Sequence, residues 1–449
     1  MAIAAVALAA GCASLPPVPP SPPAAFATRV PCPDGLAPGT DCRSGRDGEG
    51  AFVWLAVPAE WNGTLVVHAH GGPELGTPRA ERPVEDLRRW SIWNRAGYAY
   101  AGSGFAQGGV AVRAAADDVE RSRRLFVATF GTPRRTVLHG QSWGAGVAMQ
   151  TLERHQRGAA PYDAALLTSG VLGGRRSYDA RLDLRAVWQA VCGDHPRPDE
   201  PQYPIWRGLP AGSTLTRAEL ARRAEACTGA RAARDARTPE QQRRRETLVR
   251  LTRIPADALA AHLAWATWHF EDIAARRTGE RAAFGNRGVV YGDPARPEDA
   301  ALNARVPRVD ADPDARAWLA ADTETSARLE IPVLQLHALD DPTAFVELAS
   351  AFAERMRASG NAARLVQVFT DEDEHSYLND PLYVAAIESL LGWQAGAPTP
   401  TPRGVAERCA ATVARFAARE PCRVRPDAVA APLDARVAPR APDVRDAGR

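Results

Sequence analysis

Five residues, Gly140-Gln141-Ser142-Trp143-Gly144, constrain the fold of this 449-residue chain more than any other stretch. A strand is predicted over residues 135–139, which contain the short apolar run 136–138, and the residues from Ala145 onward predict a helix. A serine flanked in this way lies on a sharp strand-to-helix turn, which leaves its hydroxyl exposed at the top of a sheet. The pattern therefore predicts a nucleophilic Ser142 at the carboxyl end of a buried strand.

Short apolar runs alternate with helical patterns on both sides of this turn. Strands are predicted over 52–57, 65–69, 98–101, 135–139, 164–167, 333–336 and 365–369, and helices over 112–130, 146–155, 344–356 and 381–393. Nearly continuous apolar runs are typical of strands that are buried on both faces of a parallel sheet. Their alternation with helices predicts an α/β fold with a doubly wound, mostly parallel sheet. The Asn62-Gly63 pair favours a hairpin between the first two of these strands.

About 150 residues dominated by helical patterns separate the strand at 164–167 from the strand at 333–336. Helix starts are predicted at Thr216 and Thr238, and a helix rich in aromatic residues is predicted over 259–275. This segment is most simply an inserted helical cap. We therefore expect a core in two parts, 32–175 and 326–397, with the cap at 176–325 between them. A C-terminal extension is expected over 398–449. Its last 25 or so residues are expected to lie extended on the surface or to be disordered.

Donors for an oxyanion are predicted beside Ser142. The segment His70-Gly71-Gly72-Pro73 follows the strand at 65–69 and forms a tight loop at the same edge of the sheet. Stabilising a tetrahedral oxyanion requires preorganised N–H groups. We expect the backbone N–H groups of Gly72 and Trp143 to supply them, with His70 shaping the loop.

The acid and the base of a catalytic triad are expected after the serine, in that order. Asp341 lies in the loop that follows the strand at 333–336, and it is the preferred acid, with Asp340 as the alternative. His375 lies in the loop after the next strand and is the predicted base. Because the carboxyl ends of parallel strands meet at one edge of the sheet, these side chains are expected to converge on Ser142.

The His-Gly-Gly-Pro loop and the Gly-x-Ser-Trp-Gly turn resemble those of the α/β-hydrolase superfamily, over roughly residues 50–175 and 325–395. They are similar to capped secreted esterases and to proline iminopeptidase-like members. The resemblance implies a Ser142–His375–Asp341 arrangement under a pocket roofed by the insertion. The peptidases hold a substrate ammonium with cap carboxylates. Their local cap pattern has no match here, although Glu271-Asp272 follows the aromatic helix.

Together these features predict a serine hydrolase that cleaves carboxylic esters through an acyl-enzyme, with no cofactor and no metal. Phe105, Trp265 and Trp268 are expected to form an apolar pocket wall with Trp143. The alternatives are an aminopeptidase that uses the same triad and a non-catalytic, hydrolase-like binding protein at the cell surface. The expected partner is a small or polymeric ester. Fifty-five basic against 53 acidic residues, a net charge of +2, argue against nucleic acid or an anionic membrane as the partner.

The first residues predict export. Residues 2–10 are apolar and Leu8-Ala9-Ala10-Gly11-Cys12 follows the pattern of a bacterial lipoprotein signal, so 1–12 is interpreted as a signal peptide and Cys12 as the lipidation site. A Pro-rich linker is expected over 13–31. The protein would then be periplasmic, anchored in the outer membrane through Cys12 alone, or secreted. A disordered apolar N-terminus is the other interpretation.

The remaining six cysteines are an even set, as expected of an exported chain with disulfides. Six cysteines allow 15 pairings, and short loops close most readily. Proximity therefore favours Cys32–Cys42, Cys192–Cys227 and Cys409–Cys422. Buried free thiols in a cytosolic enzyme are the alternative, and no Cys/His spacing indicates a zinc site.

Overall fold

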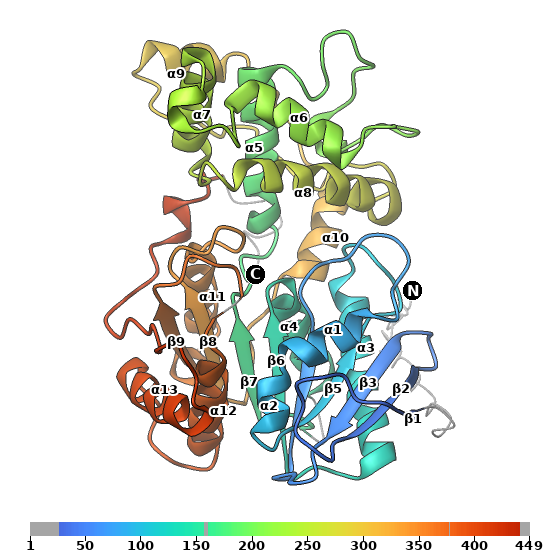
Figure 1. Ribbon diagram of the computed structural model, residues 1–449. Helices are drawn as coiled ribbons and strands as arrows, with labels where there is room; N and C mark the ends of the chain where they lie inside the picture. Colours follow the sequence, from blue (N-terminus) through green and yellow to red (C-terminus); the bar gives the residue numbers. More distant parts are fainter. Residues whose placement is uncertain (1–26, 157–159, 377, 441–449) are drawn as a thin grey trace, which may run out of the picture.

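A single sheet lies at the centre of the computed structural model, which describes residues 27–156, 160–376 and 378–440 (Figure 1). Within those residues the sheet has nine strands in the order β1-β2-β3-β5-β4-β6-β7-β8-β9. Strands β4 to β9 run parallel to one another, and β1 to β3 form an antiparallel edge. Their bounds are β1 (Thr28–Val30), β2 (Asp41–Arg46), β3 (Phe52–Val57), β4 (Thr64–Ala69), β5 (Ala99–Ser103), β6 (Arg135–Gln141), β7 (Ala164–Thr168), β8 (Val333–Ala338) and β9 (Leu365–Thr370).

Helices cover both faces of this sheet. Alternate strand residues point to opposite faces: Leu138 packs in one apolar cluster with α3 (Val112–Phe130), α4 (Trp143–His155) and α11 (Glu347–Ala358). Its neighbour Val137 packs in a second cluster. That cluster contains residues of α2 (Ser91–Arg95), α12 (Asp380–Gln394) and α13 (Pro402–Phe416), and the short α1 (Arg82–Arg89) leads into α2. The predicted doubly wound, mostly parallel sheet is confirmed, and the chain has the α/β-hydrolase fold.

The predicted hairpin between β3 and β4 is wrong. β5 lies between these two strands, antiparallel to β3 and parallel to β4. Side chains close the turn locally, because Asn62 Oδ1 accepts the Thr64 N–H at 2.9 Å and Trp61 Nε1 donates to the Thr64 carbonyl at 2.8 Å. All six residues of β4 are buried, and the strand has a parallel neighbour on each side.

The segment between β7 and β8 folds into helices that lie over one end of the sheet (Figure 1), and this segment is called the cap below. The Thr216 side chain accepts the Glu219 N–H, and Thr238 forms a reciprocal capping box with Gln241. These caps satisfy N–H groups that a helix start leaves without partners. The cap helices are α5 (Arg176–Cys192), α6 (Arg217–Thr228), α7 (Pro239–Thr252), α8 (Leu259–Asp272), α9 (Pro297–Asn303) and α10 (Pro313–Thr323).

After α13 the chain returns across the core to the cap. Residues 424–440 lie extended along the surface, as one of the two expectations had it, but the side chains of Ala430, Leu433 and Val437 are buried. Val437 is only 1% exposed and packs in an apolar cluster with Leu348 of α11. Arg436 pairs with Glu347 of α11 at 3.0 Å, and Arg440 Nη2 donates to Asp183 of α5 at 2.7 Å. Buried apolar side chains and ion pairs thus hold this segment, hereafter the C-terminal strap, against both the core and the cap.

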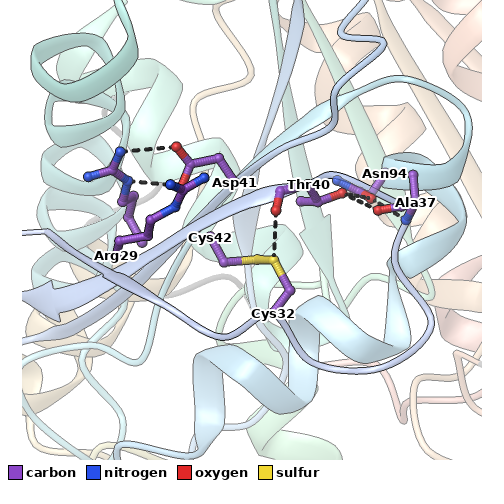
Figure 2. The surroundings of a disulfide bond; sticks show 8 residues. Arg29, Cys32, Ala37, Thr40, Asp41, Cys42 and Asn94 are labelled. Carbon is purple, nitrogen blue, oxygen red and sulfur yellow. Dashed lines mark hydrogen bonds and ion pairs between the residues drawn. A yellow bond between two sulfur atoms is a disulfide. The ribbon is translucent and has the colours of Figure 1, made fainter.

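The six described cysteines are paired as Cys32–Cys42, Cys192–Cys227 and Cys409–Cys422. Figure 2 shows the first pair, which ties the loop after β1 to β2 beside the hydrogen bonds from Ala37 and Thr40 to Asn94. The proposed signal peptide with Cys12 and most of the Pro-rich linker lie outside the described residues. Among the described helices, none has the length and apolarity needed to cross a bilayer.

Two histidines are buried side by side in the centre of the sheet. The Nδ1 atoms of His68 on β4 and His139 on β6 lie 2.8 Å apart, so one ring donates to the other. His139 Nε2 lies 3.0 Å from the Thr168 hydroxyl. Burial, reinforced by nearby cationic groups, lowers the pKa of each ring well below the ordinary value of 6.5.

This histidine pair predicts a loss of stability in mild acid. The unfolded chain binds protons at these rings below about pH 6.5, whereas the folded chain does not until far lower pH. Protons therefore favour unfolding, and the free energy of unfolding should fall by about 2 kcal/mol per ring between pH 7 and pH 5. Circular dichroism melts across this range measure the effect. A melting temperature that stays level down to pH 5 would contradict the prediction. Repeating the series in 0.5 M salt is the control, because salt weakens surface ion pairs and leaves the titration of the buried rings in place.

Candidate active site

Ser142 lies on a strained turn between β6 and α4. Its backbone has φ 56° and ψ −122°, a conformation that side-chain-bearing residues rarely adopt. Close packing explains the two glycines: a Cβ on Gly140 would lie 2.5 Å from the Gly144 carbonyl oxygen, and one on Gly144 would lie 2.1 Å from the Ala69 carbonyl oxygen. The helix can approach the end of β4 only because neither residue carries a side chain. The turn then presents the serine hydroxyl at the carboxyl edge of the sheet.

The structure brings the three predicted triad residues together from separate loops. His375 Nε2 lies 2.8 Å from Ser142 Oγ, and His375 Nδ1 lies 2.8 Å from Asp341 Oδ2. These distances are those of good hydrogen bonds. The imidazole thus bridges the hydroxyl and the carboxylate, in the order in which a nucleophile, a base and an orienting acid must stand.

Asp341, rather than Asp340, lies within hydrogen-bond distance of His375. Its carboxylate is buried, and Oδ1 accepts the backbone N–H groups of Thr343 and Ala344, both at 2.8 Å. Asp340 is exposed and has no contact with His375. His337 Nε2 lies 3.8 Å from Asp341 but donates to the Ala344 carbonyl at 2.7 Å, and burial lowers the pKa of this ring. His337 therefore stays neutral at pH 7 and leaves the carboxylate to His375.

Ser376 fixes the loop that carries His375. Its hydroxyl accepts a hydrogen bond from Gln141 Nε2 at 2.5 Å, and its carbonyl accepts one from the Tyr383 hydroxyl at 3.1 Å and one from Arg89. Gln141 immediately precedes the nucleophile, so the serine turn and the histidine loop are joined directly. This contact of Gln141 could not be predicted from the sequence, since the x positions of the motif carry no fixed chemistry.

Gly72 and Trp143, the predicted oxyanion donors, both line the cavity that contains Ser142. His70 Nδ1 donates to the Gly71 carbonyl at 2.5 Å, and its ring stacks on Phe105 with centroids 3.9 Å apart. Burial lowers the pKa of His70 to about 3, so the ring is neutral at pH 7. These contacts join the His70 ring to the glycine loop.

The cavity has a volume of about 330 Å³. Of the predicted wall residues, Trp265 and Trp143 line it and Phe105 and Trp268 do not. Phe105 lies behind the glycine loop against His70, and Trp268 lies under the guanidinium of Arg217, 4.5 Å from its ring centre. The described lining is Gly71, Gly72, Arg82, Arg89, Gln141, Ser142, Trp143, Val171, Tyr178, Arg181, Trp265, Thr343, His375 and Ser376.

The charged side chains of this lining are all basic. Arg82, Arg89 and Arg181 line the cavity, and no aspartate or glutamate of the described chain does. Glu271 and Asp272, noted in the sequence beside the aromatic helix, are not among the lining residues, and Asp272 instead accepts the Val110 N–H at 2.8 Å. The sequence did not indicate these arginines, because they are three of many and none belongs to a motif.

No protein-family model matches the sequence, and no curated protein sequence is similar to it. The structure is similar to feruloyl esterase B from Aspergillus oryzae, with 12% identity over 80% of this chain and 81% of that one and a TM-score of 0.44. It is also similar to a ligand-bound form of the rice cell wall degrading esterase LipA from Xanthomonas oryzae, with 15% identity over 79% and 90% of the two chains and a TM-score of 0.39. The esterase EaEST from Exiguobacterium antarcticum has 14% identity over 78% and 97%, with a TM-score of 0.36.

Proposed function

We propose that this protein is a serine hydrolase that cleaves carboxylic esters. The observation that carries the proposal is the continuous line of hydrogen bonds from Asp341 through His375 to Ser142, which ends at a cavity lined by apolar and cationic side chains. A serine hydroxyl is a weak nucleophile until an adjacent base removes its proton. In this proposal His375 is that base, and the buried Asp341 carboxylate orients it.

In the proposed reaction His375 Nε2 takes the proton of Ser142 as Oγ attacks the ester carbonyl carbon. The N–H groups of Gly72 and Trp143 stabilise the oxyanion of the tetrahedral intermediate. Asp341 accepts the Nδ1–H, which keeps the proton off Nε2 and stabilises the imidazolium. His375 then returns its proton to the departing alkoxide, and the acyl group stays on Ser142. Water, deprotonated by the same ring, releases the acid and restores the serine.

The cavity favours esters over aminoacyl substrates. An aminopeptidase of the predicted alternative type needs a carboxylate to hold the substrate ammonium. Within the described residues no acidic side chain lines the cavity, whereas three arginines do. An ammonium placed beside Ser142 would therefore meet like charge and no counterion.

We also propose that the protein is exported. Disulfides persist in oxidising compartments, and the three pairs in the structure are consistent with a periplasmic or extracellular location. Lipidation of Cys12 remains part of this proposal, supported by the signal-like sequence before it.

Labelling with a fluorophosphonate probe tests the catalytic proposal. Such a probe reacts only with a serine that an adjacent base has activated. We expect covalent labelling of the native protein within minutes, at the tryptic peptide that contains Ser142, and none after heat denaturation. A panel of p-nitrophenyl esters and aminoacyl arylamides measured in parallel should show turnover of the esters only. Native protein that takes up no label would favour the non-catalytic binding protein instead.

A further inference from the structure

One cation in the cavity has no acidic partner. Arg181, on α5, lines the cavity with Ser142 and His375 and is only 6% exposed. In the described chain its hydrogen bonds go to two carbonyl oxygens, that of Ser177 at 2.7 Å and that of Thr343 at 3.4 Å, and no carboxylate pairs with it. Arg82, by comparison, pairs with Glu74 and Asp86, both at 3.0 Å.

The guanidinium of Arg181 is held in a fixed orientation. Its central carbon lies 4.5 Å from the centre of the Trp265 ring, and Trp265 also lines the cavity. A guanidinium has five N–H donors, and these contacts use two of them. Nε has no partner among the described residues. The group is therefore already oriented and has donors to spare, which suits bidentate binding of a planar anion.

Burial alone makes this arrangement unfavourable. It lowers the pKa of Arg181 to about 10, so the side chain is still a cation at neutral pH. A buried charge without a counterion destabilises a folded protein unless something compensates it. No acidic side chain of the described residues lines the cavity, so a bound anion would supply the missing counterion.

We propose, building on the esterase function above, that Arg181 binds a carboxylate of the substrate. The preferred substrates are then esters that carry a free carboxylate in addition to the ester bond that Ser142 attacks. Trp265 supplies an apolar face beside that carboxylate. A carboxylate, rather than an ammonium or a neutral chain, completes the charge of this site.

Matched pairs of esters test the proposal. We compare monoethyl adipate with diethyl adipate by pH-stat titration, and 4-acetoxybenzoate with its methyl ester by absorbance. In wild-type protein kcat/KM should be about 10- to 100-fold higher for the anionic member of at least one pair, the range expected of a charge-assisted hydrogen bond. Free adipate or benzoate should inhibit hydrolysis of the neutral esters competitively.

The variants Arg181→Met and Arg181→Lys separate binding from structure. The first should remove the preference for the anionic ester and the inhibition by free carboxylate, so that kcat/KM falls at least ten-fold more for the anionic member of a pair than for the neutral one. The second keeps the charge without the planar fork and should restore part of the preference. Arg217→Met is the matched control, because Arg217 also lies over a tryptophan of α8 but is exposed and outside the cavity lining.

Two results overturn the proposal. One is a wild-type protein that hydrolyses neutral esters as fast as anionic ones and ignores free carboxylates. The other is an Arg181→Met variant that loses activity on both members of each pair equally, which would make Arg181 a support for the Asp341 loop through Thr343. Either result leaves the esterase function standing, whereas a protein that turns over no ester and takes up no fluorophosphonate removes that function itself. Should the methionine variant fail to fold, carboxylate inhibition of the wild type and the lysine variant carry the test.

Discussion

Replacing Ser142 by alanine should lower ester turnover by about 10⁵-fold or more while the protein stays folded. The variant removes only the Oγ atom that lies 2.8 Å from His375 Nε2. Without it no acyl-enzyme forms, and the oxyanion donors and the bound substrate support only a slow attack by water. Alanine also fits the turn no worse than serine, since the serine side chain caps no backbone group of α4. Initial rates with p-nitrophenyl butyrate, together with a thermal melt of each protein, measure both quantities.

Ser122→Ala is the matched control for this variant. Ser122 is also a buried serine, but it lies on α3, where its hydroxyl donates to the Val119 carbonyl at 2.7 Å. We expect wild-type turnover from this control. Turnover by Ser142→Ala within ten-fold of wild type would show that another group attacks the ester, and the proposed mechanism would be lost.

Replacing Asp341 by asparagine should lower kcat by about 10⁴-fold. Oδ1 of Asp341 accepts the N–H groups of Thr343 and Ala344, and these two donors would hold the amide oxygen of the asparagine in the same place. The amide NH₂ would then point at His375 Nδ1, which must become an acceptor. The ring proton moves to Nε2, the atom that has to receive the proton of Ser142. The base is thus present but in the wrong tautomer.

Asp340→Asn is the control for the acid, because this neighbouring carboxylate is exposed and does not contact His375. Its kcat should stay within about two-fold of wild type. Stopped-flow burst measurements on both variants show whether acylation is the step that slows. A larger loss for Asp340→Asn than for Asp341→Asn would reverse the assignment of the acid.

The sequence predicted most of what lies at the carboxyl edge of the sheet. The turn around Ser142 and the two downstream loops are short, and each directly follows an apolar strand, so strand order and loop position were enough to bring their side chains together. Its place in the loop already favoured Asp341 over Asp340, but the sequence left both open. Only in the structure do burial and the two backbone donors distinguish one aspartate from the next.

Other features could not be predicted because they depend on contacts between distant segments. The Asn62-Gly63 turn favours a hairpin locally, yet pairing with β5 and β6 buries β4 on both sides and overrides that preference. Phe105 and Trp268 are aromatic residues that the sequence suggested for the pocket wall. In the structure Phe105 packs behind the glycine loop against His70, and Trp268 packs against Arg217. Arg181 stands out only by its burial without a carboxylate, which no local pattern encodes.

The C-terminal strap has a consequence for how substrates enter. Two stretches of chain join the cap to the core, and side-chain contacts of the strap add a third connection. Arg436 contacts both Glu347 of the core and the Arg253 carbonyl of the cap. Arg440 binds Asp183 of the cap. The cap can move away from the core only if these contacts break. We therefore expect substrates to reach Ser142 without a large movement of the cap.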